Sequence, residues 1–336
     1  LASGGRQVGA AALVHGRGVV TLRIFRSLEE LDAADFPRGT AVAIGKFDGV
    51  HLGHRSVFAR LCEAARERDL ESLVFTFSRN PLSLLRPELC PVPVMSPAQR
   101  IEEIGRAGID AVVMVDFTTA FAQTSAEEYA ERVLAGTLGA KHVIVGADFH
   151  FGNRGAGDIV QLEAFGRRFG FTVEIIDEVG TPAGERVSST RIREAIVVGD
   201  VAGAGAMLGR EVAVRGTVVH GDARGRDLGF PTANLGGEVE GLVPADGVYA
   251  GYAIIDGVTH VAAISVGNNP TFTPEGQSRV EAFLLDFSGD LYGKTMEVRF
   301  AHRIRGMVAF AGIDALIEVM NEDVRITREL LDARPL

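Results

Sequence analysis

The sequence predicts an α/β domain built on a doubly wound parallel sheet, followed by an antiparallel β-barrel domain that ends in a C-terminal helix. Apolar runs alternate with amphipathic helical segments between residues 41 and 176, which is typical of a parallel sheet. After residue 210 the pattern changes to short strands separated by turns, which is typical of a barrel. At 336 residues the chain has the length of two domains, which we place at residues 22–200 and 207–336.

The first domain is expected to contain five parallel strands. They are predicted at Ala41–Ile44, Ser72–Phe77, Ala111–Val115, His142–Gly146 and Phe171–Ile176. Helices are predicted at His54–Arg68, from the Ser96 cap and Pro97 to Ala107, and from Ser125, with Glu128 as its capping partner, to Leu134. Because ligands bind beyond the carboxyl ends of parallel strands, the site residues are expected just after these strands.

The second domain is expected to follow a connector rich in glycine and alanine, Gly199–Gly209. Its strands are predicted at Glu211–Val219, Gly247–Ile255, Thr259–Val266, Val280–Phe287 and Thr295–Ile304. A final amphipathic helix, about Gly312–Leu331, would cover one side of this barrel.

The composition indicates which kinds of molecule the protein binds. The formal net charge of −10 argues against broad nucleic-acid affinity, because binding to a phosphate backbone needs a basic face. Cys62 and Cys90 form no C-x-x-C pair and indicate a reduced, cytoplasmic setting. The first 21 residues lack a sustained apolar core, so we expect a frayed leader and no signal peptide or membrane span. We expect small-molecule partners, with the chain a monomer or a transient oligomer.

The segment Ala41–His54, AVAIGKFDGVHLGH, predicts a strand, a turn and a helix N-terminus that together suit a phosphate. Gly45 ends the strand, and Gly53 leaves room for a phosphate chain to approach the backbone. His51 and His54 are three residues apart, so their rings should share one face of the first helical turn. One histidine at such a place is most often a polar cap. Two in H-x-G-H directly after a Gly-x-Phe-Asp-Gly turn favour phosphate binding.

Two later segments also follow strands. Ser188–Arg193, SSTRIR, opens a helix, where hydroxyls, helix N–H groups and an arginine would make a second phosphate cradle, although Ser-Ser-Thr alone is simply a good N-cap. Ala147–Asp158, ADFHFGNRGAGD, is glycine-rich and could be an ordinary turn. Its two phenylalanines and two aspartates favour an aromatic ligand with phosphate or metal.

In the second domain, Gly216–Leu235 (GTVVHGDARGRDLGFPTANL) combines many glycines with a Pro-Thr-Ala-Asn segment. The Thr232 hydroxyl and the Asn234 amide oxygen are hard oxygen ligands of the kind that Mg²⁺ prefers. Glu281 opens the apolar strand VEAFLLDF, where a carboxylate is costly unless it has a partner or a role. The alternative is a surface-facing glutamate at a strand start.

The H-x-G-H segment resembles the nucleotidyltransferase superfamily, and the chain after about Thr21 resembles the bacterial bifunctional riboflavin kinase and FAD synthetase family. The matching motifs are GKFDGVHLGH, GADFHFG, SSTRIRE, GRDLGFPTANL, PADGVYAG, SVGNNPTF, VEAFLLDF and DLYGK. The resemblance implies a riboflavin kinase barrel that transfers the γ-phosphate of ATP to riboflavin. It also implies an N-terminal domain that joins the resulting FMN to AMP, giving FAD and pyrophosphate.

The resemblance also implies roles for single residues. Glu281 would be the kinase base, and Thr232 and Asn234 would hold Mg²⁺. His51, His54 and Arg193 would act on the ATP phosphates in the N-terminal domain, and Asp148, Phe149 and Asn80 would lie on the flavin side. The remaining nucleotide ligands would be Gly45, Phe47, Asp48, Gly53, Ser188, Ser189 and Thr190 in the first domain and Gly221, Gly225 and Arg226 in the kinase.

One segment departs from the family pattern. Where the family usually reads Phe-Asp-Pro-His-Pro with an aromatic residue four positions on, this chain has Phe77-Ser78-Arg79-Asn80-Pro81 and then Leu85. In the kinase half, Met307-Val308-Ala309 is less polar than the family tends to be. Two rival hypotheses are a non-catalytic flavin-binding protein and a riboflavin kinase whose first domain acts weakly or on another phosphate ester. Retention of Glu281 and of both histidines argues against the first of these.

Overall fold

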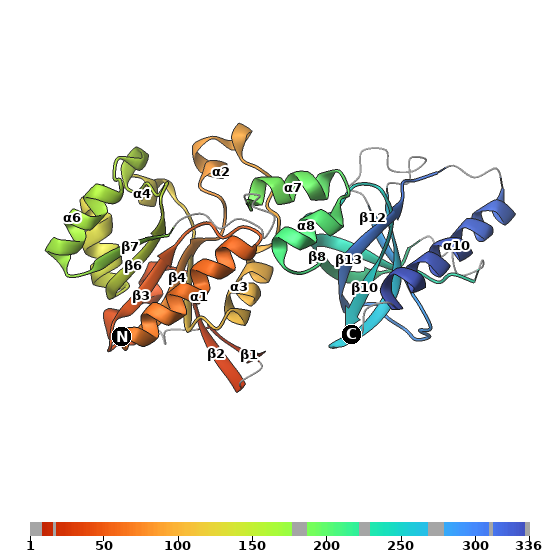
Figure 1. The fold of residues 1–336 in the computed structure, drawn as a ribbon, viewed down its shortest axis with the longest axis horizontal. Helices are drawn as coiled ribbons and strands as arrows, with labels where there is room; N and C mark the ends of the chain where they lie inside the picture. The colour runs from red at the N-terminus through yellow and green to blue at the C-terminus, as the bar shows by residue number, and fades with distance from the viewer. Residues whose placement is uncertain are drawn as a thin grey trace, which may run out of the picture. The chain divides into compact units, whose positions relative to one another are not determined.

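The computed structural model describes residues 9–15, 18–176, 187–221, 229–267, 279–308 and 312–332. Their contacts divide the chain into two units, each with its own sheet (Figure 1). The first unit holds the described residues up to Val92 and those from Pro97 to Val187. The second holds Pro93–Ser96 and the described residues from Ser188 onward.

The first unit is built on a seven-stranded sheet with the order β1-β2-β5-β4-β3-β6-β7. Its strands are β1 (Gly9–His15), β2 (Gly18–Phe25), β3 (Thr40–Ile44), β4 (Glu71–Phe77), β5 (Ala111–Val115), β6 (Ala140–Gly146) and β7 (Thr172–Ile176). From β2 to β7 all neighbours run parallel. The predicted parallel sheet is confirmed, and each of the five predicted strands is present.

The frayed leader is a wrong prediction. β1 pairs with β2 in an antiparallel hairpin from Gly9–Ile24 to His15–Gly18, and β2 continues the sheet in parallel beside β5. The small apolar residues around Ala10 therefore belong to an edge strand. The composition was misleading because a run of small residues has weak strand propensity alone, and the ladder with β2 supplies the missing stabilisation.

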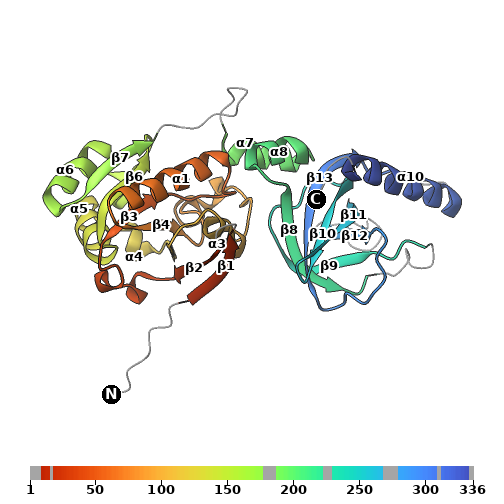
Figure 2. The same ribbon diagram turned by 60° about the horizontal axis from the view of Figure 1, so that its bottom comes forward.

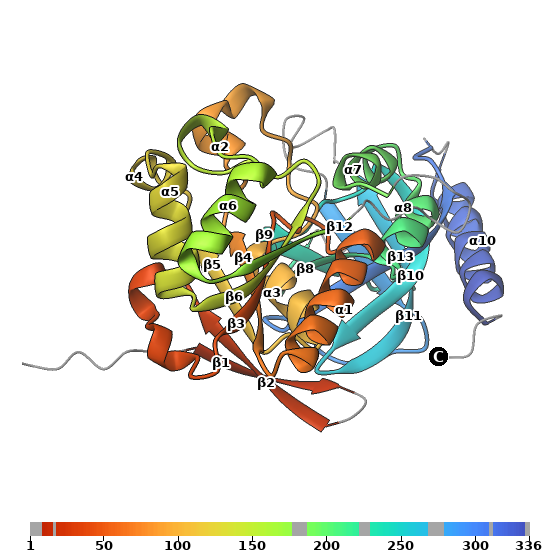
Figure 3. The same cartoon turned by 60° about the vertical axis from the view of Figure 1, so that its left-hand side comes forward.

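Helices cover both faces of this sheet, as Figures 1 and 3 show. They are α1 (Leu52–Glu67), α2 (Leu82–Leu85), α3 (Pro97–Arg106), α4 (Thr119–Ala122), α5 (Ala126–Glu128) and α6 (Ile159–Phe169), with short 3₁₀ turns η1 (Leu28–Glu30), η2 (Ala33–Asp35), η3 (Pro87–Leu89) and η5 (Asn153–Gly155). The predicted Ser125 helix begins as α5 and continues as a π-helical segment, η4 (Tyr129–Thr137). The sequence analysis missed α6, which Asp158 caps by accepting the Gln161 N–H at 2.9 Å.

The strand order reverses between β3 and β6. The chain moves from β3 through β4 to β5 on one side, and then from β6 to β7 on the other. In open α/β sheets a ligand crevice lies beyond the carboxyl ends of the strands at such a reversal. The Gly-x-Phe-Asp-Gly turn follows β3, and the ADFHFG loop follows β6. The topology therefore brings these two predicted segments to one place.

The second unit contains a closed six-stranded barrel with the order β10-β11-β12-β9-β8-β13 (Figure 2). Its strands are β8 (Val212–Val219), β9 (Ala233–Glu240), β10 (Gly247–Ile255), β11 (Val258–Gly267), β12 (Arg279–Leu284) and β13 (Thr295–Arg305). The predicted barrel is confirmed. β9 was not predicted, because its sequence ANLGGEVE has two glycines and little alternation, and pairing with β8 and β12 stabilises it.

Two helices precede the barrel, α7 (Ser189–Val197) and α8 (Val201–Leu208). The predicted Gly199–Gly209 connector is therefore wrong over most of its length. Asp200 caps α8 by accepting the Gly203 N–H at 2.8 Å, and Gly209 ends it in the left-handed region. Capping at both ends and burial of Met207 and Leu208 outweigh the low helix propensity of its glycines.

The C-terminal end of α7 is hydrogen-bonded to β13 and to the loop before β10. The Ala245 N–H donates to the Ile196 carbonyl at 3.3 Å, and Arg303 donates to the Val198 carbonyl at 3.0 Å. The final helix, α10 (Ile313–Asp332), confirms the predicted C-terminal helix and packs on β10, β11 and β13 through Leu331 and its neighbours. Among the described residues, no helix is both long and apolar enough to cross a membrane.

Candidate active sites

The turn after β3 holds the two histidines in one fixed arrangement. Phe47, Gly49 and Val50 all have left-handed backbone angles, with φ of 50°, 84° and 40°. A β-branched residue such as Val50 is strained there, and strain of this kind concentrates at functional sites. The turn ends at His51, which is the N-cap of α1, so the helix begins at Leu52, two residues before the prediction.

The rings of His51 and His54 are stacked, with centroids 3.6 Å apart and an interplanar angle of 17°. His51 Nδ1 accepts the backbone N–H of His54 at 3.3 Å. A neutral His51 ring therefore carries its proton at Nε2, where it can be donated to an anion. The two rings and the positive end of α1 together make a place for phosphate oxygens.

Phe47 packs inside the protein, beneath the histidines. Its ring is buried, packs edge-on against His54 with centroids 5.2 Å apart, and lies 4.8 Å from Phe58. Gly45 permits this, because a Cβ there would come within 2.8 Å of the Phe47 ring. The structure thus gives both residues a role in supporting His54. Asp48 is half-buried, and Gly53 is buried in the first turn of α1.

The SSTRIR segment forms the N-terminus of α7. Ser188 is its N-cap and accepts the Arg191 N–H at 3.3 Å, so the capping alternative weighed from the sequence is present here. Thr190 is exposed, and Ser189 and Arg193 are half-buried. This helix groups with the second unit, whereas His51 and His54 belong to the first.

A large aromatic pocket lies within the first unit, with a volume of about 660 Å³. Its walls come from the loops after β4, β5 and β6 and from η4. The rings in its lining are Phe77, Phe117, Phe121, Tyr129, Phe149 and Phe151. Phe149 stacks on Phe151 with centroids 5.5 Å apart and an interplanar angle of 12°. A flat aromatic ligand fits such a lining.

In the segment Ser78–Leu85, which departs from the family pattern, some residues line the pocket and others do not. Pro81, Leu84 and Leu85 line the pocket, and Leu85 is 56% exposed. Asn80 lies just before α2, and its side-chain oxygen accepts the Leu82 N–H at 3.1 Å. Asp148 is exposed and, like Asn80, is absent from the lining, whereas Phe149 is part of it.

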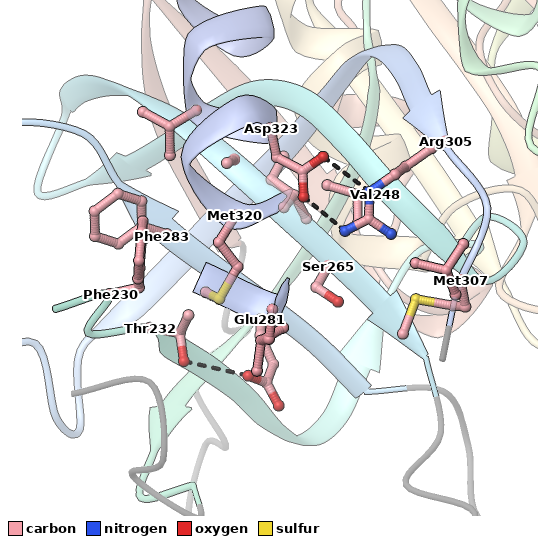
Figure 4. Close-up of a pocket in the computed structure, with 15 residues that line it drawn as sticks. Phe230, Thr232, Val248, Ser265, Glu281, Phe283, Arg305, Met307, Met320 and Asp323 are labelled. Atoms are coloured by element: carbon pink, nitrogen blue, oxygen red, sulfur yellow. Dashed lines mark hydrogen bonds and ion pairs between the residues drawn. The ribbon is translucent and has the colours of Figure 1, made fainter. Parts of the chain in front are cut away.

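In the barrel, three polar side chains stand in one row across adjacent strands. Asn234 on β9 is paired with Glu281 on β12, which is paired with Ser265 on β11, and directly opposed residues share a face of the sheet. The Thr232 hydroxyl donates to Glu281 Oε2 at 3.2 Å (Figure 4). Glu281 therefore lines, together with Thr232, the pocket that α10 borders. The arrangement contradicts the alternative of a surface glutamate, because Glu281 lines a pocket.

The predicted metal ligands suit a magnesium ion bound chiefly by phosphate. Thr232 and Asn234 offer oxygen ligands, and the chain approaches Asn234 so closely at Gly221 that a Cβ there would lie 2.7 Å from the amide oxygen. Gly221 thus lies directly against this amide, and two oxygen ligands suffice because Mg²⁺ usually takes few protein ligands. No cluster of three or more histidine, cysteine or acidic side chains is found among the described residues. Gly225 and Arg226 lie outside the described residues.

The barrel pocket has a volume of about 240 Å³ and an apolar lining closed by α10. Arg305 on β13 donates to Asp323 on α10 through two parallel bonds, Nε to Oδ1 at 2.9 Å and Nη2 to Oδ2 at 2.7 Å (Figure 4). Met307 and Val308, noted above as unusually apolar, are half exposed at its margin. Glu281 and the Arg305–Asp323 pair are the charged groups of this lining.

Sequence reasoning missed several pocket residues. Phe117, Phe121 and Tyr129 follow β5 and carry no motif of their own, and Asp323 is one acidic residue among several on an amphipathic helix. The helical period did indicate Asp323, since it lies three residues from Met320 and seven from Leu316 and so shares the helix face that lines the pocket.

Two family models match the chain, an FAD synthetase model over residues 33–191 and a riboflavin kinase model over residues 208–331. The bifunctional riboflavin kinase/FMN adenylyltransferase of Pseudomonas fluorescens is 38% identical over 293 residues, which cover 87% of this chain and 93% of that protein. The protein of the same name from Listeria monocytogenes is 35% identical over 290 residues, with coverage of 85% and 91%. A crystal structure described as a macrolide-efflux protein from Streptococcus pneumoniae is 34% identical with a TM-score of 0.80, and the match covers 91% of this chain and 98% of that one.

Proposed function

The chain belongs to the family of bifunctional riboflavin kinase/FMN adenylyltransferases, and we propose that it carries both activities in the order of the two family models. The second unit phosphorylates riboflavin to FMN with ATP. The first unit then transfers AMP from a second ATP to FMN, giving FAD and pyrophosphate. The observation that carries the proposal is the Glu281 carboxylate, which lies in an apolar pocket beside Thr232 and across the ladder from Asn234.

In the kinase reaction Glu281 acts as the base. The 5′-hydroxyl of riboflavin would lie against this carboxylate, which takes the hydroxyl proton as the oxygen attacks the γ-phosphorus and ADP leaves. The apolar lining receives the flavin ring and excludes water around the carboxylate. Thr232 orients Glu281 through its hydrogen bond at 3.2 Å.

Thr232 and Asn234 are the proposed Mg²⁺ ligands. When bound there, Mg²⁺ supplies positive charge that stabilises the transferring phosphoryl group. Gly221, Gly225 and Arg226 are the proposed phosphate ligands of the glycine-rich segment that precedes Thr232.

In the adenylyl transfer, a phosphate oxygen of FMN attacks the α-phosphorus of ATP and pyrophosphate leaves. The chain needs to supply only position and hydrogen-bond donors. His51 can donate from Nε2, because its Nδ1 accepts the His54 N–H. We also assign Ser189, Thr190 and Arg193 to ATP on the basis of family membership, with Ser188 as the cap that presents them.

The aromatic pocket beside β4, β5 and β6 is the proposed site for the flavin ring of FMN. It lies at the carboxyl edge of the sheet that also carries the His51 turn, and its lining includes six phenylalanine and tyrosine rings. Phe149, which the resemblance places on the flavin side, and Phe151, the second phenylalanine of the same loop, are both part of this lining. A cytoplasmic location and a monomeric or transiently oligomeric state complete the proposal. The limits of 22–200 and 207–336 differ from the two contact units, since β1 and β2 belong to the first sheet and α7 groups with the second unit.

Incubation of the whole chain with riboflavin and MgATP, followed by chromatography, tests the proposal. We expect FMN to form first and FAD later, and neither to form when EDTA removes the metal. Bound riboflavin without any product would indicate the non-catalytic alternative. FMN without FAD, even when FMN is supplied, would indicate that the Ser78-Arg79-Asn80 departure has redirected the first unit to another phosphate ester.

A further inference from the structure

Arg100 is a buried cation in the first unit that neither reaction described above uses. It lies on α3 and is only 7% exposed. Its Nη1 donates to the Lys46 carbonyl at 2.6 Å and its Nη2 to the Ser78 carbonyl at 3.0 Å. Its Nε has no hydrogen-bond partner among the described residues. Burial lowers the pKa of this guanidinium, and the nearby charge of Asp48 opposes that shift.

The two carbonyls lie at the ends of neighbouring parallel strands. Lys46 follows β3 and begins the strained turn that leads to His51. Ser78 follows β4 and begins the loop whose later residues, Pro81 and Leu85, line the aromatic pocket. One guanidinium therefore joins the phosphate-side turn to the flavin-side loop.

Burying a guanidinium against neutral carbonyls is costly, since no carboxylate among the described residues is bonded to it to offset the lost hydration. Its planar fork can hold two acceptors at a fixed separation, which a lysine cannot do. The Lys46 carbonyl also accepts the hydroxyl of buried Thr76 at 3.1 Å. Arg100 and Thr76 thus both donate to the Lys46 carbonyl, next to the strained Phe47–Val50 turn. A small displacement of this carbonyl would move His51 and His54.

We propose that Arg100 is a positioning residue for adenylyl transfer, which sets the separation between the phosphate-side turn and the flavin-side loop so that bound FMN and ATP meet in line. This inference rests on the proposed FMN adenylyltransferase activity. A misplacement of about 1 Å can cost roughly 100-fold in rate while each substrate still binds. The expected signature is a loss of turnover without a matching loss of binding.

The test compares Arg100→Lys with Arg38→Lys. Arg38 joins the opposite, amino ends of the same two strands, through an exposed ion pair with Asp69 at 2.8 Å. For Arg100→Lys we expect kcat for FAD formation to fall about 10- to 100-fold. The dissociation constants for ATP alone, by calorimetry, and for FMN alone, by flavin fluorescence, should change less than about threefold. Arg38→Lys should leave all three quantities unchanged.

Thr76→Val provides a second measurement if Arg100→Lys does not fold. It removes one of the two bonds to the Lys46 carbonyl, so kcat should fall in the same way but by less, about two- to fivefold. Riboflavin kinase turnover of the same sample reports the amount of intact second unit. A fall in kcat that only follows the folded fraction of the first unit, or equal losses in kcat and in binding, would overturn the inference. Absence of FAD formation by the unaltered chain would overturn the proposed activity as well, and is measured first.

Discussion

The two pockets that we propose as flavin sites differ in their linings. The pocket of the first unit is wide, about 660 Å³, and is lined by aromatic rings drawn from several loops. The barrel pocket is about 240 Å³, and its lining carries a carboxylate and a bidentate ion pair among apolar side chains (Figure 4). The difference follows from the chemistry. Phosphorylation of a hydroxyl needs a base held in a dry site, whereas a phosphate nucleophile needs none.

The largest expected effect is the loss of FMN formation when the Glu281 carboxylate is replaced. Glu281→Gln should lower FMN formation by about 10²- to 10⁴-fold, because an amide cannot take the hydroxyl proton. FAD formation from added FMN should stay nearly intact, because the side chain belongs to the barrel pocket alone. Both rates are measured on the same sample by chromatography. Equal losses of the two activities would show that the pockets do not serve separate reactions.

The next effect concerns how the barrel pocket is closed. α10 is joined to the barrel by two bidentate pairs, Arg305–Asp323 within the pocket and Arg328–Asp286 outside its lining. Asp323→Asn should lower the free energy of unfolding by about 1–3 kcal/mol and raise the KM for riboflavin several-fold, since it removes the bidentate ion pair that ties Arg305 to α10. Thermal unfolding and kinase kinetics measure the two effects.

Asp286→Asn is the matched control. The pair it breaks is exposed, and asparagine tolerates the left-handed backbone of residue 286, where φ is 58°. The KM for riboflavin should not change. If the two variants behave alike, the pocket does not depend on the position of α10 through Asp323.

The smallest expected effect is at the margin of the aromatic pocket. Leu85 stands where the family has an aromatic residue, and we expect a raised KM for FMN with that for ATP little changed. Leu85→Phe should lower the KM for FMN about two- to tenfold, which corresponds to roughly 0.5–1.5 kcal/mol for an added ring contact. Leu89→Phe is the control, because Leu89 is equally exposed, at 58%, but is not part of the lining. No gain in Leu85→Phe, or saturation of the unaltered enzyme by low-micromolar FMN, would contradict this reading of the loop.

The parts of the fold that were predictable are those with strong local signals. Ala41–Ile44 and Ala111–Val115 are short apolar runs between breakers, and they form fully buried strands. The alternation in Thr295–Ile304 likewise indicated β13 within one residue. The β1–β2 hairpin, β9 and α8 were missed or mistaken. Their glycines and small residues have no clear period, and their stability comes from partners elsewhere in the chain.

The chemistry-bearing residues show the same division. Some candidate residues can be recognised from the sequence alone, because their chemistry needs particular atoms within short motifs. They are His51, His54, Thr232, Asn234 and Glu281. Local spacing also placed the two histidines on one helical turn. By contrast, Phe47 proved to be a support for His54, and Asp158 a helix cap.

Other site residues were not recognised from the sequence, because their partners are distant in the chain. They are Arg100, Asp323 and the rings around Leu85. Arg100 is 54 residues from Lys46 and 22 from Ser78, and Asp323 is 18 residues from Arg305. Helical period places such a side chain on a face, but which carbonyl or carboxylate meets it depends on how strands and helices pack. The candidate reactive groups of this protein lie in short sequence motifs. The residues that hold these groups in place are determined by tertiary contacts between distant parts of the chain.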